Sequence, residues 1–274
     1  MPPFRKSRAD APVGYFAWEA AGLRWLGAAT DAGGVPVATV LQVGPTHLDL
    51  VRLDPVPPTR AAAAAFGADL ARTHDPGGAD VGGADVGGAN PAFGAGPPHW
   101  LGDGFFGPTD QPLPLSLTPH FRWSAFYAAE RLTPITQGCR DAGVFDATEA
   151  ALLDRLAATI DRHDTDEAPS RIHGDLWSGN VIWTSAGATL IDPAAHHGHR
   201  EADLAMLALF GSPHLDVTIA AYQDVRPLAE GWRGRLALHQ LHPLLVHAVM
   251  FGGTYGARAA AAAQSLLDGT TNDA

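Results

Sequence analysis

The sequence has little of what disulfide-bonded, membrane-spanning and nucleic-acid-binding proteins require. Its 274 residues include one cysteine, Cys139, so no disulfide can form within the chain and a reducing cytoplasm is the expected location. No stretch approaches the roughly 18 consecutive apolar residues of a transmembrane helix, and the first residues lack the apolar core of a secretory signal. Lysine and arginine number 18 against 29 acidic residues, a formal net charge of −11, so we expect neither nucleic acid nor a membrane as a partner.

Apolar residues make up 46% of the chain, which is enough for a globular core, and 274 residues suit one large domain or two lobes. In the first part of the chain, segments rich in valine, leucine and threonine predict a small sheet next to a helix. Strands are expected at residues 3–6, 35–43 and 48–53, and apolar residues at helical spacing predict a helix over 14–29. We therefore treat residues 1–54 as a small N-terminal lobe.

The remaining residues, 55–274, are expected to form a larger and mostly helical lobe, which places the chain in the α+β class. Helices are expected at 61–74, 123–131, 147–162, 201–210, 214–222, 232–250 and 256–267. Asp146 or Thr148 is a suitable N-cap for the third of these helices. Residues 77–90 form a near-repeat, GGADVGGADVGGAN, with few large apolar side chains, and we interpret them as a flexible insertion without chemistry.

A polar segment between residues 173 and 192 has the features of a phosphoryl-transfer site. Asp175 precedes Asn180 by five residues in HGDLWSGN, and Asp192 follows a predicted hairpin. A kinase catalytic loop has this spacing between its base aspartate and a metal-binding asparagine, and a second metal-binding aspartate comes later. Because Mg²⁺ prefers oxygen ligands, the pattern predicts a kinase that uses ATP and Mg²⁺. An ordinary turn is the alternative, but the hairpin and the trailing Ile-Asp favour the kinase.

The chain resembles the fructosamine-3-kinase and ketosamine-3-kinase family, within the aminoglycoside-phosphotransferase-like group. HGDLWSGN together with GHREADLAM is the most specific pair of motifs. The matching stretches cover nearly the whole chain: FAWEAAGLRWL (16–26), HWLGDGFFGPTDQP (99–112), FRWSAFYAAERL (121–132), RIHGDLWSGNVIW (171–183), LIDPAAHHGHREADLAM (190–206) and HPLLVHAVMFGGTYG (242–256). The resemblance implies a protein-kinase-like fold of two lobes with ATP between them. It also implies phosphorylation of the 3-hydroxyl of the sugar in ketosamines, which starts removal of sugar adducts from amines, including protein lysines.

The resemblance further implies roles for individual side chains. Asp175 matches the base that accepts the hydroxyl proton, and Asn180 and Asp192 match the residues that hold Mg²⁺. Lys6 resembles the strand lysine that contacts the α- and β-phosphates, with Glu19 as its partner on a helix. A solvated lysine and a surface glutamate are the alternatives for this last pair, because spacing alone supports it.

The remaining candidate residues lie around the nucleotide and the substrate. The hinge that binds adenine through backbone groups is expected at Arg52, Leu53 and Asp54. Four side chains are candidates for contact with the ketosamine: Trp177, His173, Glu201 and Trp123. Trp177 suits stacking on a sugar face, whereas Trp123 suits the core as well. Of the two carboxylates that open the helix at 201–210, we expect Asp203 to bind the catalytic loop and Glu201 to contact substrate.

Two groups of histidines are candidate metal ligands. Those at 196, 197 and 199 are of a type that binds transition metals, but their spacing matches none of the common zinc patterns. Those at 239, 242 and 247 lie on a predicted helix, where positions in the core or in a substrate pocket are expected. We therefore predict ATP and Mg²⁺ as the cofactors.

The sequence departs from the family pattern before Lys6. Two strands and a glycine-rich loop normally precede this lysine, which here stands close to the first residue. A start codon further upstream, a shortened and weakened kinase, and a protein that is no longer an enzyme are three explanations, and the intact aspartates favour the first two. Two other functions stay open: phosphorylation of an aminoglycoside or another amine-bearing small molecule, and binding by an inactive kinase-like protein. The oligomeric state stays open as well.

Overall fold

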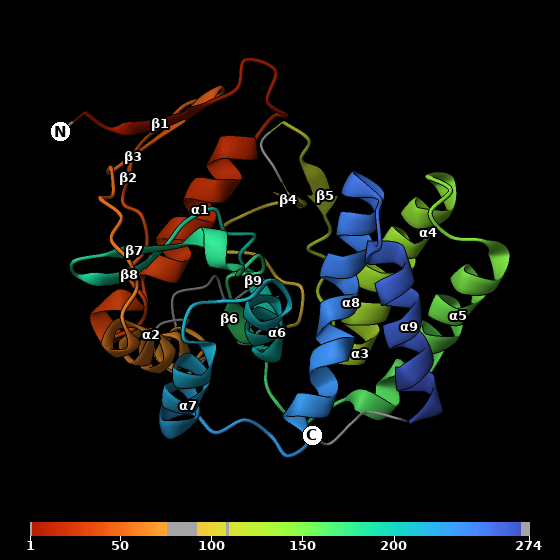
Figure 1. Cartoon of the computed structure of the whole chain (residues 1–274). Coiled ribbons are helices and arrows are strands. Elements are labelled where there is room, and N and C mark those ends of the chain that lie inside the picture. Colours follow the sequence, from red (N-terminus) through yellow and green to blue (C-terminus); the bar gives the residue numbers. More distant parts are fainter. Residues whose placement is uncertain (1, 76–91, 108–109, 270–274) are drawn as a thin grey trace.

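Three short antiparallel strands form a sheet in the N-terminal part of the protein. The structure, a computed structural model, describes residues 2–75, 92–107 and 110–269, so the predicted insertion at 77–90 lies outside the described residues. The sheet has the order β1-β3-β2 and consists of β1 (Phe4–Ser7), β2 (Val40–Val43) and β3 (His47–Leu50). Lys6 lies opposite Leu48 in this sheet. Figure 1 shows the sheet at one end of the molecule, with helix α1 (Tyr15–Gly27) beside it.

Helix α1 buries the apolar residues whose spacing predicted it. Phe16, Leu23 and Leu26 are at most 1% exposed, and the side chain of Glu19 lies among them at 5%. Phe16 and Leu23 join Leu48 of β3 in one apolar cluster, so the helix is fixed to the sheet by side-chain packing. Because α1 and β1 are held together in this way, Glu19 and Lys6 come within reach of each other.

The strand predicted over residues 35–43 is shorter than expected. β2 begins at Val40, because the segment before it pairs with a different part of the chain. The backbone N–H of Ala38 donates to the carbonyl of Leu190, and the N–H of Leu190 donates to the carbonyl of Pro36, both at 2.9 Å. This segment therefore connects the N-terminal sheet to the hairpin that ends before Asp192.

Helices make up most of the regular secondary structure described after residue 54, as predicted. The helices are α2 (Arg60–Thr73), α3 (Trp123–Phe126), α4 (Thr133–Asp141), α5 (Ala147–Ala158), α6 (Glu201–Phe210), α7 (Leu215–Val225), α8 (Trp232–Phe251) and α9 (Tyr255–Asp268). Asp146 caps α5 in a reciprocal capping box with Glu149. The expected helix at 123–131 is divided, since a π-helical segment, Tyr127–Leu132, separates α3 from α4. The α+β class is confirmed, and a division near residue 54 stays a prediction.

Three two-stranded ladders complete the described structure. They are β4 (Gly104–Phe106) with β5 (Leu113–Leu115), β6 (Ser170–Ile172) with β9 (His196–Gly198), and β7 (Val181–Thr184) with β8 (Gly187–Leu190). The β7–β8 hairpin was predicted, whereas the other two ladders were not. No described helix is long and apolar enough to cross a membrane.

Two apolar clusters stabilise the helical part of the protein. One lies among α5, α8 and α9, where Leu153, Leu245 and Ala263 are fully buried. The other lies between α2 and the β7–β8 hairpin, where the rings of Phe66 and Trp183 meet edge-to-face at 5.6 Å. Figure 1 shows α2 and α7 on the side of the hairpin and α8 and α9 on the opposite side. The hairpin therefore rests on a packed support.

A glycine allows α2 and α7 to approach closely, and its replacement is expected to destabilise the protein. A Cβ on Gly67 would lie 2.1 Å from the carbonyl oxygen of Thr218. We expect Gly67→Ala to lower the free energy of unfolding by about 1–3 kcal/mol in urea denaturation, because overpacking outweighs the better helix propensity of alanine. Gly138→Ala in α4 is the matched control, since its Cβ would meet Val249 at an ordinary 3.8 Å. Equal effects at both positions would contradict this account.

Candidate active site

A cavity of about 710 Å³ lies between the N-terminal part and the helical part. It is lined by Asp203 and by seven of the residues proposed for catalysis or for contact with nucleotide or substrate: Lys6, Glu19, Trp123, Asp175, Trp177, Asn180 and Asp192. These seven come from β1, α1, α3, the loop after β6 and the segment after β8. Side chains that are up to 186 residues apart in sequence are therefore brought to one concave surface, as Lys6 and Asp192 show.

The loop that carries Asp175 is fixed by a buried carboxylate on α6. The backbone N–H groups of His173 and Gly174 donate to the two oxygens of Asp203, at 2.7 and 2.9 Å. Gly174 has φ 79°, and a Cβ there would lie 2.3 Å from the carbonyl oxygen of Ala194, so glycine is required. Asp203 was expected to bind the catalytic loop, and its hydrogen bonds to the loop confirm this position.

Asp203 is held ionised inside the protein. Burial works to raise its pKa, but the hydrogen bond from His74 and the donors of the loop bring the pKa below its ordinary value. His74 lies 3.0 Å from Asp203 through Nε2 and 2.9 Å from the hydroxyl of Tyr222 through Nδ1. Because a carboxylate can only accept, Nε2 of His74 carries the proton and Nδ1 accepts from Tyr222. Burial lowers the pKa of His74, so the imidazole is neutral.

His173 connects the catalytic loop to the segment that carries Asp192. Its Nε2 donates to the carbonyl of Ile191 at 2.8 Å, and its Nδ1 accepts from the backbone N–H of Asp175 at 3.2 Å. The side chain is buried at 1% exposure and does not line the cavity. The sequence predicts a contact between His173 and substrate. Its position indicates instead that His173 links the catalytic loop to the segment before Asp192.

Asp175 and Asn180 contact each other directly across the loop. The Asn180 amide donates through Nδ2 to the backbone carbonyl of Asp175 at 2.8 Å and to its carboxylate at 3.2 Å. Burial raises the pKa of Asp175 to about 8, and the carboxylates of Asp192 and Asp203 add to this effect. Since Asn180 uses its nitrogen for Asp175, its amide oxygen is left for a cation.

Lys6 connects the N-terminal sheet to the segment after β8 that carries Asp192. Its Nζ lies 2.7 Å from Glu19 and 3.0 Å from Oδ1 of Asp192. Burial opposes the charged form, but the two carboxylates raise the pKa of Lys6. The predicted pairing of Lys6 with Glu19 is therefore present. Asp192 has φ 54°, a left-handed conformation that is uncommon outside glycine and occurs at functional sites.

The two tryptophans have different environments. Trp177 is 41% exposed at the edge of the cavity, so its ring is available to a ligand. Trp123 is 4% exposed and stacks on Tyr127 with ring centroids 4.9 Å apart. It belongs to the apolar cluster of the helical part and also lines the cavity. Both interpretations of Trp123 from the sequence therefore agree with its position.

Glu201 does not line the cavity, although we had predicted a contact with substrate. Its carboxylate is fully buried and accepts two hydrogen bonds from Arg235, at 2.6 and 2.9 Å. Burial works to raise its pKa, but hydrogen bonds from His239 and Arg235 lower it to about 2. Sequence reasoning missed Arg235 because it lies 34 residues away on another helix. The position of Glu201 indicates a structural role.

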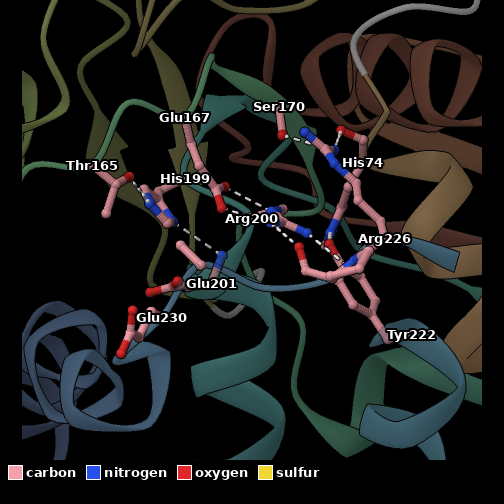
Figure 2. A network of polar contacts seen from close by, with 12 residues as sticks. His74, Thr165, Glu167, Ser170, His199, Arg200, Glu201, Tyr222, Arg226 and Glu230 are labelled. Carbon is pink, nitrogen blue, oxygen red and sulfur yellow. Dashed lines mark hydrogen bonds and ion pairs between the residues drawn. The ribbon is translucent and has the colours of Figure 1, made fainter. Parts of the chain in front are cut away.

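Glu201 belongs to a wider polar network around the start of α6, which Figure 2 shows. Arg200 binds Glu167 through two hydrogen bonds of 2.6 Å, and Thr165 contacts His199 at 3.0 Å. The cluster His199, Glu201 and His239 has ligand atoms within 4.8 Å of one another. Arg235 donates to both oxygens of Glu201 and His239 lies 3.3 Å from one of them, so these residues form an ion-pair network. The network fixes α6 and, through it, Asp203.

The residues proposed for the adenine hinge lie beyond the cavity wall. Arg52, Leu53 and Asp54 follow β3 in the segment that leads to α2, and none of the three lines the cavity. The side chain of Arg52 contacts the carbonyl of Pro3 at 3.4 Å. The segment then joins the hairpin, because the N–H of Val56 donates to the carbonyl of Trp183 at 2.8 Å. A hinge formed by backbone groups stays a prediction.

The cavity continues past Asp175 into a region that sequence reasoning did not assign. Its wall there contains Phe106, Phe126, Arg131, His196 and His242, from β4, α3, the π-helical segment, β9 and α8. Burial lowers the pKa of His196 to about 3 and that of His242 well below its ordinary value. Both imidazoles are therefore neutral. This side of the cavity is aromatic, with one buried guanidinium.

Comparisons with known proteins agree with this geometry. A model of the fructosamine kinase family matches residues 2–269. A protein of Lactiplantibacillus plantarum named "Probable ketoamine kinase" is 32% identical, over 92% of this chain and 82% of its own length.

Two solved structures also resemble the chain. The crystal structure of a proposed fructosamine-3-kinase from Thermobifida fusca YX-ER1 has a TM-score of 0.84 and 43% identity, covering 98% of this chain and 86% of its own. A second crystal structure, of a proposed fructosamine-3-kinase from Haemophilus somnus 129PT, has a TM-score of 0.75 and 22% identity. The match covers 96% of this chain and 82% of the other, and at this identity it shows the fold alone. With the family match spanning residues 2–269, the chain belongs to the fructosamine kinase family.

Proposed function

We propose that this protein transfers the γ-phosphoryl group of ATP to the 3-hydroxyl of the sugar in ketosamines and so starts removal of the sugar adduct. One observation carries the proposal: Asp175, Asn180 and Asp192 line one cavity together with the Lys6–Glu19 pair. Membership of the fructosamine kinase family supports the substrate class. Phosphoryl transfer depends mainly on positioning and charge stabilisation, and this cavity provides fixed groups for both.

Asp175 is the proposed base. Its carboxylate would accept the proton of the sugar hydroxyl as that oxygen attacks phosphorus. The backbone around it is held by Asp203 and His173, so the carboxylate keeps its direction when the substrate binds. Its raised pKa, about 8, gives the carboxylate greater proton affinity than an ordinary aspartate.

The oxygen ligands and the lysine fit a magnesium nucleotide. Asn180 keeps its amide oxygen for a cation, and Asp192, with a side chain 40% exposed, has Oδ2 beside the oxygen that binds Lys6. These two residues would hold Mg²⁺, which when bound neutralises charge on the phosphates. Lys6 is bound on one side by Glu19, so its ammonium is held where it can donate to a phosphate oxygen.

Substrate would enter beside Trp177, whose exposed ring suits the apolar face of a sugar. The aromatic side of the cavity would then take the amine part of the ketosamine. An assay with ATP, Mg²⁺ and fructosyl-lysine tests the proposal, with a panel of aminoglycosides in parallel. Phosphorylation at the sugar 3-hydroxyl supports it. Turnover of aminoglycosides without turnover of the ketosamine would contradict it.

Lys6 is expected to be required for efficient phosphoryl transfer. We expect Lys6→Met to lower kcat/KM for the ketosamine roughly 100-fold, because it removes a fixed positive charge beside the phosphates and leaves Glu19 buried without its partner. Arg5→Met on the same strand is the control, since Arg5 pairs with Asp49 and does not line the cavity. Steady-state kinetics with both variants measure the effect, and similar losses in both would contradict the assignment.

A further inference from the structure

One cation in the cavity wall has no role in the reaction proposed above. Arg131 lies in the π-helical segment, and its side chain lines the cavity although the residue is only 4% exposed. Its Nη1 donates to the backbone carbonyls of Ser116 and Glu130, at 3.0 Å each. Its Nη2 is buried and has no hydrogen-bond partner among the described residues. Segments of π-helix often occur at functional sites.

This guanidinium is not neutralised by an ion pair within the part of the chain that the structure describes. Two acidic side chains, Glu130 and Asp103, act on it through space, and both are engaged elsewhere. Glu130 accepts hydrogen bonds from Ser116 and His120, and Asp103 accepts one from a backbone N–H. Burial of a charge without a partner is costly, and so is a buried donor without an acceptor. The guanidinium therefore has one donor, and part of its charge, that these contacts leave without a partner.

Arg131 lies one layer of side chains away from the catalytic loop. His196 packs against Gly174, the residue before Asp175. A Cβ on this glycine would lie 3.1 Å from the imidazole of His196. The ring of His196 is 5.8 Å from that of Phe126, and the guanidinium of Arg131 lies 4.5 Å from the centroid of the same phenylalanine ring. A ligand with its reacting hydroxyl at Asp175 can thus extend along these side chains toward the guanidinium.

The groups around Arg131 compensate its positive charge only in part. His196 and His242 face the same part of the cavity, and both are neutral because burial lowers their pKa values. The phenylalanine below the guanidinium contributes a cation–π contact, which offsets only part of the cost of burial. Sugar hydroxyls would accept a hydrogen bond from Nη2, but an anion would also neutralise the charge.

We propose that Arg131 binds a carboxylate on the amine part of the ketosamine, so that adducts of amino acids with a free carboxylate are preferred over adducts of neutral amines. This inference rests on the proposed kinase function, because it deepens the substrate class of the same cavity. The sugar lies at Asp175 and the carboxylate at the guanidinium of Arg131, which lines the same cavity. The amine and its α-carbon then lie between the two, beside His196 and Phe126.

The experiment compares two substrates that differ in one group. N-(1-deoxyfructosyl)glycine carries a carboxylate, and N-(1-deoxyfructosyl)glycinamide carries a neutral amide in its place. We expect the wild-type kcat/KM to favour the glycine adduct by roughly tenfold to a hundredfold, the range of a hydrogen bond to a charged group. In Arg131→Met the ratio of the two kcat/KM values should fall close to unity. Arg131→Lys should recover part of the preference.

The ratio of the two kcat/KM values distinguishes a loss of carboxylate recognition from a loss of protein stability. A variant that is only destabilised loses kcat/KM for both adducts and keeps their ratio. Arg140→Met on the neighbouring helix α4 is the control, because Arg140 pairs with Asp154 away from the cavity, and it should keep the wild-type ratio. A wild-type ratio close to unity, or an unchanged ratio in Arg131→Met, overturns the carboxylate site while the kinase function stands.

A second measurement decides the case in which neither adduct is phosphorylated. The proposed kinase function then fails by itself, and titration calorimetry of both adducts without nucleotide tests the carboxylate site. Tighter binding of the glycine adduct to the wild type, lost in Arg131→Met, supports the site. Equal affinity of the wild type for the two adducts, or equal affinity of both proteins for the glycine adduct, overturns it.

Discussion

Replacing Asp175 with asparagine should nearly abolish phosphoryl transfer and leave the affinity for ATP nearly unchanged. The amide has the shape of the carboxylate but cannot accept the hydroxyl proton, so we expect kcat to fall by roughly 10²–10⁴-fold, the usual contribution of a general base. The nucleotide contacts assigned to Lys6, Asn180 and Asp192 stay in place. Turnover with the ketosamine and titration calorimetry with the magnesium nucleotide measure the two effects separately.

Asp216→Asn is a matched control for this variant. Asp216 lies at the start of α7, where it contacts Arg60 at 3.5 Å on the surface, and it does not line the cavity. The control should have the kcat and the melting temperature of the wild type. Full turnover by Asp175→Asn would show that another group accepts the proton, and the base assignment would then be wrong.

The catalytic loop was predictable because its chemistry is encoded by local spacing. Asp175 and Asn180 are five residues apart and contact each other, and the hairpin that follows returns the chain to Asp192. Two short apolar segments on either side of the Ser185–Gly187 turn predicted the hairpin, and polar residues at both of its ends indicated the site. The helix predicted over 61–74 from its alanine and leucine content agrees with α2 to within a residue at each end, whereas α5 ends four residues before the predicted boundary at 162.

The positions that sequence reasoning missed depend on contacts between distant segments. Glu201 opens a helix, where a carboxylate facing solvent and one facing a buried arginine look the same in sequence; its partner Arg235 is on α8. β9 was missed because its pairing with β6 is 24 to 28 residues distant and involves three residues on each strand. No sequence pattern indicates that Arg131 is buried, since an arginine near the end of an amphipathic segment is ordinarily solvated.

The arrangement around Lys6 bears on whether the protein is an active kinase. A protein that binds no nucleotide would have no need for a half-buried lysine between two carboxylates, because an ion pair of this kind contributes little stability by itself. Lys6 nevertheless contacts both Glu19 and Asp192. This geometry favours a protein that binds nucleotide phosphates, as the proposed phosphotransferase does, over one that binds only a protein partner.

Asp203 is expected to control both stability and activity through the loop that it holds. Asp203→Asn keeps the shape of the side chain but places an NH₂ group against donors, since the N–H groups of His173 and Gly174 and Nε2 of His74 all point at the carboxylate. We expect the free energy of unfolding to fall by about 3 kcal/mol, the cost of leaving buried donors unpaired. Activity should fall as well, because Asp175 loses its support.

The pH dependence distinguishes this explanation from a general loss of packing. Because the pKa of Asp203 is lowered in the folded protein, its stabilising contribution is complete above the pKa of an unfolded aspartate and is lost as the pH falls through the lowered value. The difference in unfolding free energy between wild type and Asp203→Asn should therefore be constant near neutral pH and shrink in acid. Asp224→Asn, on the exposed face of α7, is the control and should change neither quantity. A difference that stays the same down to strongly acidic pH would mean that the carboxylate charge does not hold the loop.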